Sequence, residues 1–128
     1  MIRILLVCIE NSCRSQMAEG FARKLGRGKI EAFSAGSNPS GKVEKVAIEV
    51  MKEKNVDISA QKSKGFDDLK GENFDYVITM GCRAVCPFVS AMQRIEWDVS
   101  DPKGKSIEAF RQVRDEIERK VKEFFDGL

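Results

Sequence analysis

The sequence predicts an α/β protein: one doubly wound domain over residues 1–128, with a four-stranded parallel sheet flanked by helices on both faces. Two observations favour this class. Short apolar runs alternate with amphipathic segments of helical spacing, which is typical of parallel strands joined by right-handed crossovers. The length of 128 residues suits a single domain that buries roughly two-thirds of the surface its unfolded chain exposes. In such a sheet the ligand is expected at the carboxyl ends of the strands.

The N-terminal part begins with a strand, a loop and a helix. Residues 2–7, Ile-Arg-Ile-Leu-Leu-Val, are almost continuous in branched side chains and predict a fully buried strand. Apolar residues at helical spacing over 17–25 predict a helix that Gly26 ends. Residues 30–35 predict a second strand, which the turn-rich run 36–41 ends.

The middle of the chain carries one helix and a polar connection. Apolar residues on one face of 43–51 predict a second helix that ends near Asn55. Residues 57–73 are polar and punctuated by glycine, and a short helical turn is expected only at residues 66–69.

The C-terminal part completes the sheet and ends in a helix. Residues 74–80 predict a third buried strand, and residues 95–99 a shorter fourth one. From Ser106 onward apolar side chains recur at helical spacing, which predicts a long amphipathic helix.

Composition and charge argue against several classes of function. Lys and Arg total 22 against 20 Asp and Glu, and the net charge of +2 is spread along the chain. This balance gives no drive toward nucleic acid or a membrane surface. No stretch approaches the about 20 apolar residues of a membrane span, and no signal-peptide pattern precedes the first strand. We therefore expect a cytoplasmic protein with no nucleic-acid or membrane partner.

The four cysteines and the absence of histidine narrow the chemistry. Cys8, Cys13, Cys82 and Cys86 are more typical of catalytic or redox-active thiols in such a protein than of a disulfide framework. Without histidine the chain has no Cys-His dyad, no Ser-His-Asp triad and no histidine metal site. Any general acid must be a carboxylate, and any nucleophile must be activated by its surroundings. We expect no metal and no cofactor.

The octapeptide at residues 8–15 joins the first strand to the first helix. A thiol ends the strand and an arginine opens the helix, so a nucleophile, backbone N–H donors, a guanidinium and a helix N-terminus converge. This arrangement predicts a loop that binds a tetrahedral oxyanion beside a thiolate. The residues of the predicted oxyanion-binding loop are Cys8, Ile9, Glu10, Asn11, Ser12, Cys13, Arg14 and Ser15.

Two residues of the loop also have plainer interpretations. Cys8 taken alone is a small apolar residue that finishes a buried strand. Ser15 is either the N-terminal cap of the helix or a hydroxyl donor that favours the Cys8 thiolate, and both roles can hold together. The spacing of Cys8 and Arg14 at a strand-to-helix junction favours the nucleophile.

Further motifs agree with this loop. They are Cys-Ile-Glu-Asn-Ser-Cys-Arg-Ser-Gln-Met-Ala-Glu-Gly over residues 8–20, Ser-Ala-Gly over 34–36, the Cys82 and Cys86 pair, and Asp-Pro at 101–102. With them the chain resembles the thioredoxin-coupled arsenate reductase family, which shares the fold of the low-molecular-weight protein tyrosine phosphatases. The resemblance covers essentially the whole chain and implies that fold.

The resemblance also implies an activity and its residues. Cys8 attacks arsenate while Arg14 stabilises the developing charge and Asp101 acts as general acid. Cys82 then attacks Cys8 and releases arsenite, and Cys86 attacks Cys82 to form a disulfide that thioredoxin reduces. The implied partners are arsenate or a phosphate-like oxyanion and thioredoxin, the protein is expected to be a monomer, and the segment from Gly81 to about Ser90 is expected to move.

Two other functions stay open at this point. One is a low-molecular-weight phosphotyrosine or aryl phosphatase with a phosphocysteine intermediate, which needs no second thiol. The other is a non-catalytic oxyanion-binding or redox-sensing protein. The plain interpretation of Asp101 is a turn residue before Pro102, and that of Cys82 and Cys86 is a pair of small buried residues. The extra cysteines and Lys103, which stands where the phosphatases often have tyrosine, favour the reductase.

The chain departs from the family pattern at three places. Cys82 and Cys86 have three residues between them, where the best-known reductases have a longer spacer. Glu10 stands where glycine is usual, and its side chain is expected to point outward. Some family members bind potassium through residues that match Asn11, Glu19 and Ser34. Lys64 stands where a further acidic ligand is expected, so we expect its ammonium to replace the ion.

Overall fold

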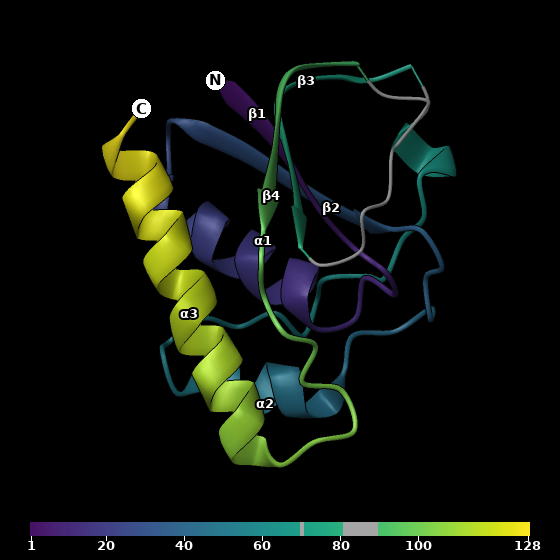
Figure 1. The fold of residues 1–128 in the computed structure, drawn as a ribbon, viewed down its shortest axis with the longest axis vertical. Helices are drawn as coiled ribbons and strands as arrows, with labels where there is room; N and C mark the ends of the chain where they lie inside the picture. The colour runs from purple at the N-terminus through teal and green to yellow at the C-terminus, as the bar shows by residue number, and fades with distance from the viewer. Residues whose placement is uncertain (70, 81–89) are drawn as a thin grey trace.

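The computed structural model describes residues 1–69, 71–80 and 90–128. A four-stranded parallel sheet with the strand order β2-β1-β3-β4 forms its centre (Figure 1). The strands are β1 (Ile2–Cys8), β2 (Ile30–Gly36), β3 (Asn73–Met80) and β4 (Ser90–Trp97). The predicted parallel sheet is confirmed. Because β2 and β3 lie on opposite sides of β1, the carboxyl end of β1 is at the switch point where such sheets bind ligands.

Strand β1 is buried on both faces. Its side chains alternate between two cores, with Ile4 and Leu6 on one face of the sheet and Leu5 and Val7 on the other. Each of these four is at most 1% exposed. The continuous run of branched residues in the sequence therefore belongs to a strand without a solvent face.

Three α-helices share the core on one face of the sheet (Figure 1). They are α1 (Arg14–Leu25), α2 (Lys45–Lys52) and α3 (Ile107–Asp126). Phe21 of α1, Met51 of α2 and Phe110 of α3 are all buried in this core. Helix α3 starts where the sequence predicts it, and Ser106 Oγ caps it by accepting a hydrogen bond from Ala109 N at 3.3 Å.

The second face of the sheet is covered differently. The 3₁₀ helix η1 (Asp67–Leu69) places Leu69 in a core with Leu5 and Val77, and Phe66 packs at its margin. Among the described residues, the prediction of helices on both faces is therefore met by α-helices on one face and by η1 on the other. The connection over 57–73 contains too few apolar residues for an amphipathic α-helix.

Two elements differ from the predictions at both of their ends. Strand β4 begins at Ser90 and ends at Trp97, whereas residues 95–99 were the predicted strand. Met92 and Gln93 in its first half are exposed because β4 is an edge strand, and the pairing of β4 with β3 defines the strand better than its side chains do. Helix α2 is shorter than predicted at both ends, and Asn55 follows it in the left-handed region with φ 60°.

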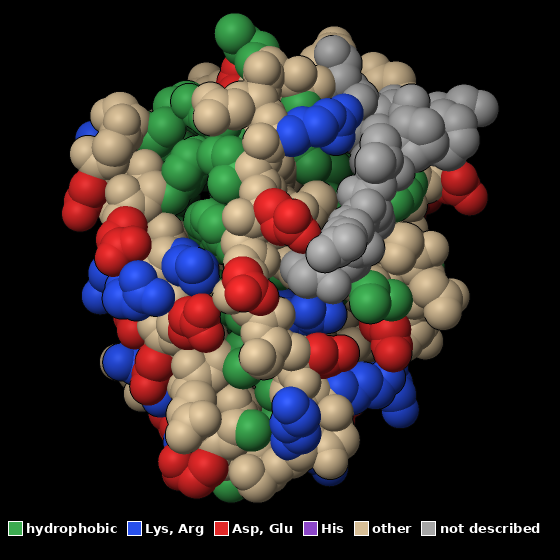
Figure 2. Space-filling model, in the orientation of Figure 1, with side chains coloured by type: hydrophobic (Ala, Val, Ile, Leu, Met, Phe, Trp, Pro, Cys, Tyr) green, Lys and Arg blue, Asp and Glu red, His purple; other side chains and the backbone are tan. Residues whose placement is uncertain are grey.

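Helix α3 carries charges of both signs, which are interspersed on the face shown in Figure 2. Arg111 and Arg114 of this helix pair with Glu53, just after α2, at 2.9 and 2.6 Å. Their guanidinium groups lower the pKa of Glu53 to about 2, so this carboxylate keeps its charge at neutral pH. None of the described helices is long and apolar enough to cross a membrane.

Candidate active site

The loop between β1 and α1 turns its carbonyl groups outward. Six consecutive carbonyl oxygens accept hydrogen bonds from outside the loop or from α1: the donors are Ser37 N for Cys8, Asn38 N for Ile9, Ser40 N for Glu10, Gln16 Nε2 for Asn11, Glu44 N for Ser12 and Met17 N for Cys13. By contrast, the backbone N–H groups of residues 9–13 donate to no residue within the described ranges. These N–H groups are thus left free to bind an anion, as in other backbone anion sites.

The loop fits against β2 only because residue 36 is glycine. A Cβ atom on Gly36 would lie 2.4 Å from Ile9 O and 2.8 Å from Asn11 N, both backbone atoms that cannot turn away. Gly36 pairs with Cys8 in the sheet, and its N–H donates to Lys64 O at 2.8 Å. This close approach fixes the path of the loop beside the end of β2.

Cys8 lies at the base of the loop beside a hydroxyl group. Its side chain is 2% exposed, and its Sγ lies 2.8 Å from Ser15 Oγ. Asn11 Nδ2 donates to the same Ser15 oxygen at 2.6 Å, which leaves the hydroxyl proton free to point at the sulfur. The residue at the N-cap of α1 is Cys13, not Ser15. Of the two interpretations of Ser15, the structure therefore places the hydroxyl next to the thiol.

Buried amides hold Asn11 in its unusual conformation. Asn11 is fully buried with a left-handed φ of 51°. Gln16 Nε2 donates to both Asn11 O and Asn11 Oδ1 at 2.9 Å, and Lys64 N donates to Asn11 Oδ1 at 2.7 Å. Gln16 Oε1 accepts in turn from Gln61 Nε2 at 2.7 Å. The sequence reasoning missed both glutamines as members of the site.

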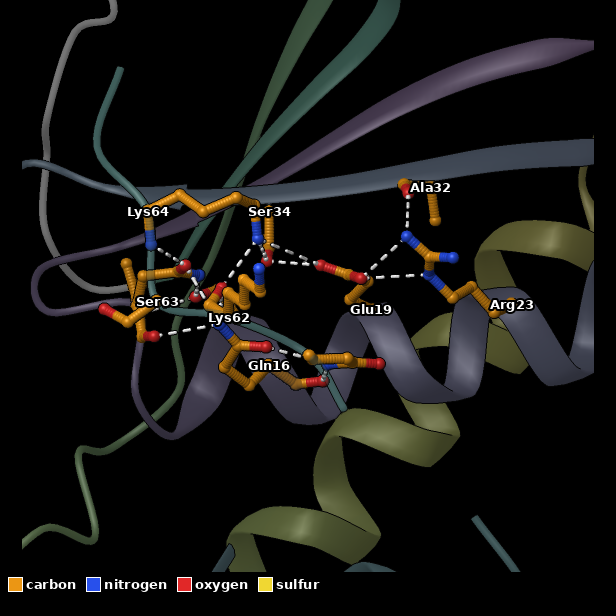
Figure 3. Close-up of polar contacts among 12 residues, drawn as sticks. Gln16, Glu19, Arg23, Ala32, Ser34, Lys62, Ser63 and Lys64 are labelled. Carbon is orange, nitrogen blue, oxygen red and sulfur yellow. Dashed lines mark hydrogen bonds and ion pairs between the residues drawn. The ribbon is translucent and has the colours of Figure 1, made fainter. Parts of the chain in front are cut away.

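Lys64 completes a charged cluster beside α1 (Figure 3). Its Nζ lies 3.4 Å from Ser34 Oγ, 3.8 Å from Glu19 Oε1 and 2.8 Å from Lys62 O. Ser34 donates to the Glu19 carboxylate, and Arg23 pairs with it at 2.9 Å. Burial lowers the pKa of Lys64. The ammonium group thus stands beside two of the residues that the resemblance makes potassium ligands.

Arg14 and Asp101 meet at the other side of the loop. Arg14 is 4% exposed, its Nη1 donates to Val99 O at 3.0 Å, and its Nη2 lies 3.7 Å from Asp101 Oδ2. The Asp101 side chain is 47% exposed. The buried guanidinium can bind an anion inside the loop, and the carboxylate lies at the mouth of the loop. This arrangement suits an anion site with a general acid.

The whole chain matches a known family. Residues 3–128 match the model of the low molecular weight phosphotyrosine protein phosphatase family. The chain belongs to this family. It is 42% identical to the glutaredoxin arsenate reductase of Synechocystis over 94% of both chains. It is 40% identical to arsenate reductase 2 of Staphylococcus saprophyticus over 97% of this chain and 96% of that one.

Solved structures agree with this assignment. The fold is similar to that of an arsenate reductase in the phosphate binding state, with a TM-score of 0.90 and 39% identity over 99% of this chain and 98% of that one. The low molecular weight protein tyrosine phosphatase from T. tengcongensis is similar with a TM-score of 0.79 and 29% identity over the full length of both chains. The thioredoxin-dependent arsenate reductase of Corynebacterium glutamicum is similar with a TM-score of 0.81 and 28% identity, over 99% of this chain and 61% of that one.

In this member of the low molecular weight phosphatase family, Cys13 is the second cysteine of the oxyanion loop and, like Cys8, is buried. The Cys13 Sγ lies 3.7 Å from Ser12 Oγ, and burial raises the pKa of the Cys13 thiol to about 12. Cys13 is therefore a neutral thiol at physiological pH. Among the described residues, no group of three or more Cys, Asp or Glu side chains is arranged to hold a metal ion.

The two remaining predicted site residues, Cys82 and Cys86, lie outside the described residues, as does the predicted moving segment up to its last residue, Ser90. Strand β3 ends at Met80, and Thr79 pairs with Val7, the residue before Cys8. The chain thus reaches the predicted cysteine pair from the sheet edge where Cys8 lies.

Proposed function

We propose that this chain is an arsenate reductase, which reduces arsenate to arsenite by a cysteine relay regenerated by thioredoxin. The observation that carries the proposal is the Cys8 thiol at the base of a loop with unused N–H groups, with Arg14 and Asp101 on one side. Relatives named arsenate reductase at 40–42% identity over nearly the whole chain support the reductase over a phosphatase. All 128 residues act as one domain in this proposal.

The first step forms a bond between sulfur and arsenic. Arsenate is a tetrahedral oxyanion like phosphate, so the loop N–H groups and Arg14 bind its oxygens. The Cys8 thiolate attacks arsenic, one As–O bond breaks, and the oxygen leaves as water with a proton from Asp101. Because the loop donors are already in place, they stabilise the charge of the transition state without rearrangement.

The second step transfers two electrons to arsenic. The Cys82 thiolate attacks Cys8 Sγ, an S–S bond forms, the S–As bond breaks, and its electron pair stays on arsenic. Arsenic(V) becomes arsenic(III), and arsenite leaves. Cys86 then attacks Cys82 Sγ and frees the Cys8 thiolate, and a dithiol donor reduces the resulting Cys82–Cys86 disulfide.

The donor and compartment follow from this redox balance. Each turnover consumes two thiols, so the relay needs a reducing compartment, and we place the protein in the cytoplasm. Thioredoxin is the proposed donor, supported by the thioredoxin-dependent relative. Glutaredoxin is the second candidate, because the name of the Synechocystis relative contains it.

One assay tests the function and the donor together. Arsenite formation is measured with thioredoxin and its reductase, with glutaredoxin and glutathione, and with neither, beside hydrolysis of an aryl phosphate. We expect steady turnover of arsenate with thioredoxin and slow hydrolysis of the aryl phosphate. Turnover with glutaredoxin and glutathione but not with thioredoxin would contradict the assignment of thioredoxin as the donor. Fast phosphate hydrolysis without any arsenite overturns the reductase and makes the chain a phosphatase, the second candidate, whose chemistry Cys8, Arg14 and Asp101 suffice to perform.

A further inference from the structure

An ion pair joins the oxyanion loop to the segment that carries Asp101. Glu10, in the middle of the loop, places its carboxylate against the ammonium of Lys103, which lies 93 residues later in the chain. The Glu10 backbone is fixed separately, since its carbonyl accepts from Ser40 N at 3.1 Å and from Ser63 Oγ at 2.9 Å. Its side chain is therefore the part that reaches across the mouth of the site.

Lys103 also contacts Asp101 itself. The Lys103 N–H donates to Asp101 Oδ1 at 3.1 Å, while Arg14 Nη2 lies 3.7 Å from the other carboxylate oxygen. Pro102, between the two residues, is buried and stiffens the turn. Asp101 thus lies between two attachments to the loop, one through Arg14 at its end and one through Glu10 at its middle.

The charges of this pair suit a site for anions. Glu10 puts a negative charge on a loop that must bind an oxyanion, and Lys103 neutralises that charge. The hydrogen bond to Glu10 raises the pKa of Lys103, so the ammonium group stays charged at neutral pH. The side chains of Glu10 and Lys103 are 35% and 40% exposed, so the ion pair has the modest strength of a pair at the protein surface.

We propose that Glu10 and Lys103 are positioning residues whose ion pair holds Asp101 over the oxyanion loop at the place from which it protonates the departing oxygen. The proposal rests on the proposed function for the proton transfer. An electrostatic role alone would change the binding of the anion. A positioning role changes the step that needs the proton, because small displacements of a catalytic group are costly.

Steady-state kinetics of arsenate reduction separate these roles. Glu10→Gln removes the pair and also a negative charge. Because Asp101 loses one of its attachments, we expect kcat to fall about fivefold, with no rise in KM. Lys103→Met should lower kcat by the same factor, whereas Lys103→Arg, which keeps the positive charge, should have the kcat of the unmodified protein. The double variant Glu10→Gln/Lys103→Met should have a kcat no lower than either single variant. Lys105→Met is the matched control, as an exposed lysine two residues further on. Unchanged kcat in Glu10→Gln, or additive losses in the double variant, overturns the proposal.

The ratio of activities on two aryl phosphates is a second test. A merely structural defect would lower both activities and leave their ratio unchanged. Phenyl phosphate needs a proton on its leaving group, whereas 2,4-dinitrophenyl phosphate releases a stable anion without one. The variants should lose activity on phenyl phosphate and keep it on the dinitrophenyl ester. Equal losses on both esters, in protein whose circular dichroism is unchanged, overturn the proposal. If the unmodified protein forms no arsenite, the proposed reductase function is wrong, but the ratio of activities on the two esters still tests the role of the Glu10–Lys103 pair. If the unmodified protein hydrolyses neither ester, the kinetics of arsenate reduction test that role.

Discussion

At the level of single residues, the two cysteines of the oxyanion loop are both buried, at 2% and 3% exposure, but they occupy different positions in the loop. Cys8 lies 2.8 Å from a hydroxyl group at the base of the loop, whereas burial raises the pKa of Cys13 to about 12. A thiol reacts with an alkylating agent only as its thiolate. The thiolate of Cys13 therefore becomes significant only as the pH rises toward 12.

This contrast predicts selective alkylation at neutral pH. Iodoacetamide should label Cys8 first, with phosphate giving protection, and should leave Cys13 unlabelled. Labelling of Cys13 should rise about tenfold per pH unit in the alkaline range, because each unit raises its thiolate fraction tenfold while the pH is below the pKa. Peptide mapping by mass spectrometry measures both. Equal labelling of the two cysteines at pH 7 contradicts the assignment of Cys8 as the reactive thiol.

The buried guanidinium of Arg14 predicts that its shape matters as well as its charge. Arg14→Lys keeps the charge but cannot bind two oxyanion oxygens with a planar fork or keep the bond to Val99 O in the same geometry. We expect kcat/KM for arsenate to fall on the order of 100-fold, as for the loss of an oxyanion donor. Arg27→Lys, on the exposed surface, is the control. Activity within about twofold of normal would remove Arg14 from the mechanism.

The sequence predicts some residues of the site and not others for a physical reason. Cys8 and Arg14 lie in one continuous motif, so local order is enough to bring them together. Lys103, which pairs with the Glu10 side chain, and Lys64, whose N–H donates to Asn11 Oδ1, lie far along the chain, and only the completed fold brings them near. The outward direction of Glu10 was predicted, whereas its ion pair with Lys103 was not.

At the level of elements, the contact between β2 and the loop predicts a strict need for glycine at position 36. Gly36→Ala would force the backbone of Ile9 and Asn11 to move, so we expect a loss of about 1–3 kcal/mol in the free energy of unfolding and weaker phosphate binding. Urea denaturation and calorimetric titration measure the two effects. Gly127→Ala is the control, since its Cβ meets ordinary contacts of 3.6 Å or more. Equal behaviour of the two variants would show that the close approach is unimportant.

The elements themselves were predicted unequally well. Strand β1 and helix α3 carry clear apolar patterns and were predicted almost to the residue. The start of β4 was missed because an edge strand with an exposed surface needs little apolar pattern; its hydrogen bonds to β3 specify it. The short helical turn expected at residues 66–69 is confirmed as η1. Its role as the cover of the second face was not predicted, since only two apolar residues, Phe66 and Leu69, provide that cover.

At the level of the whole molecule, the topology gathers distant segments at one edge of the sheet. The end of β1, the start of α1, Gly36 at the end of β2, and the segments 61–64 and 99–103 all surround the oxyanion loop. The alternation of strands and helices predicts this edge as the ligand site, because parallel strands end on the same side. Which polar side chains of the irregular segments face the loop depends on packing that the alternation does not specify.

The relay itself is tested by a single turnover of arsenate without any external thiol, followed by alkylation and disulfide mapping. We predict one arsenite per chain and one Cys82–Cys86 disulfide, with Cys86→Ser stalled at a Cys8–Cys82 disulfide and Cys82→Ser forming no arsenite, because each arsenite requires two protein thiols. Arsenite formation at the normal rate in both serine variants, or a chain whose four thiols stay reduced after arsenate is added, would contradict the relay.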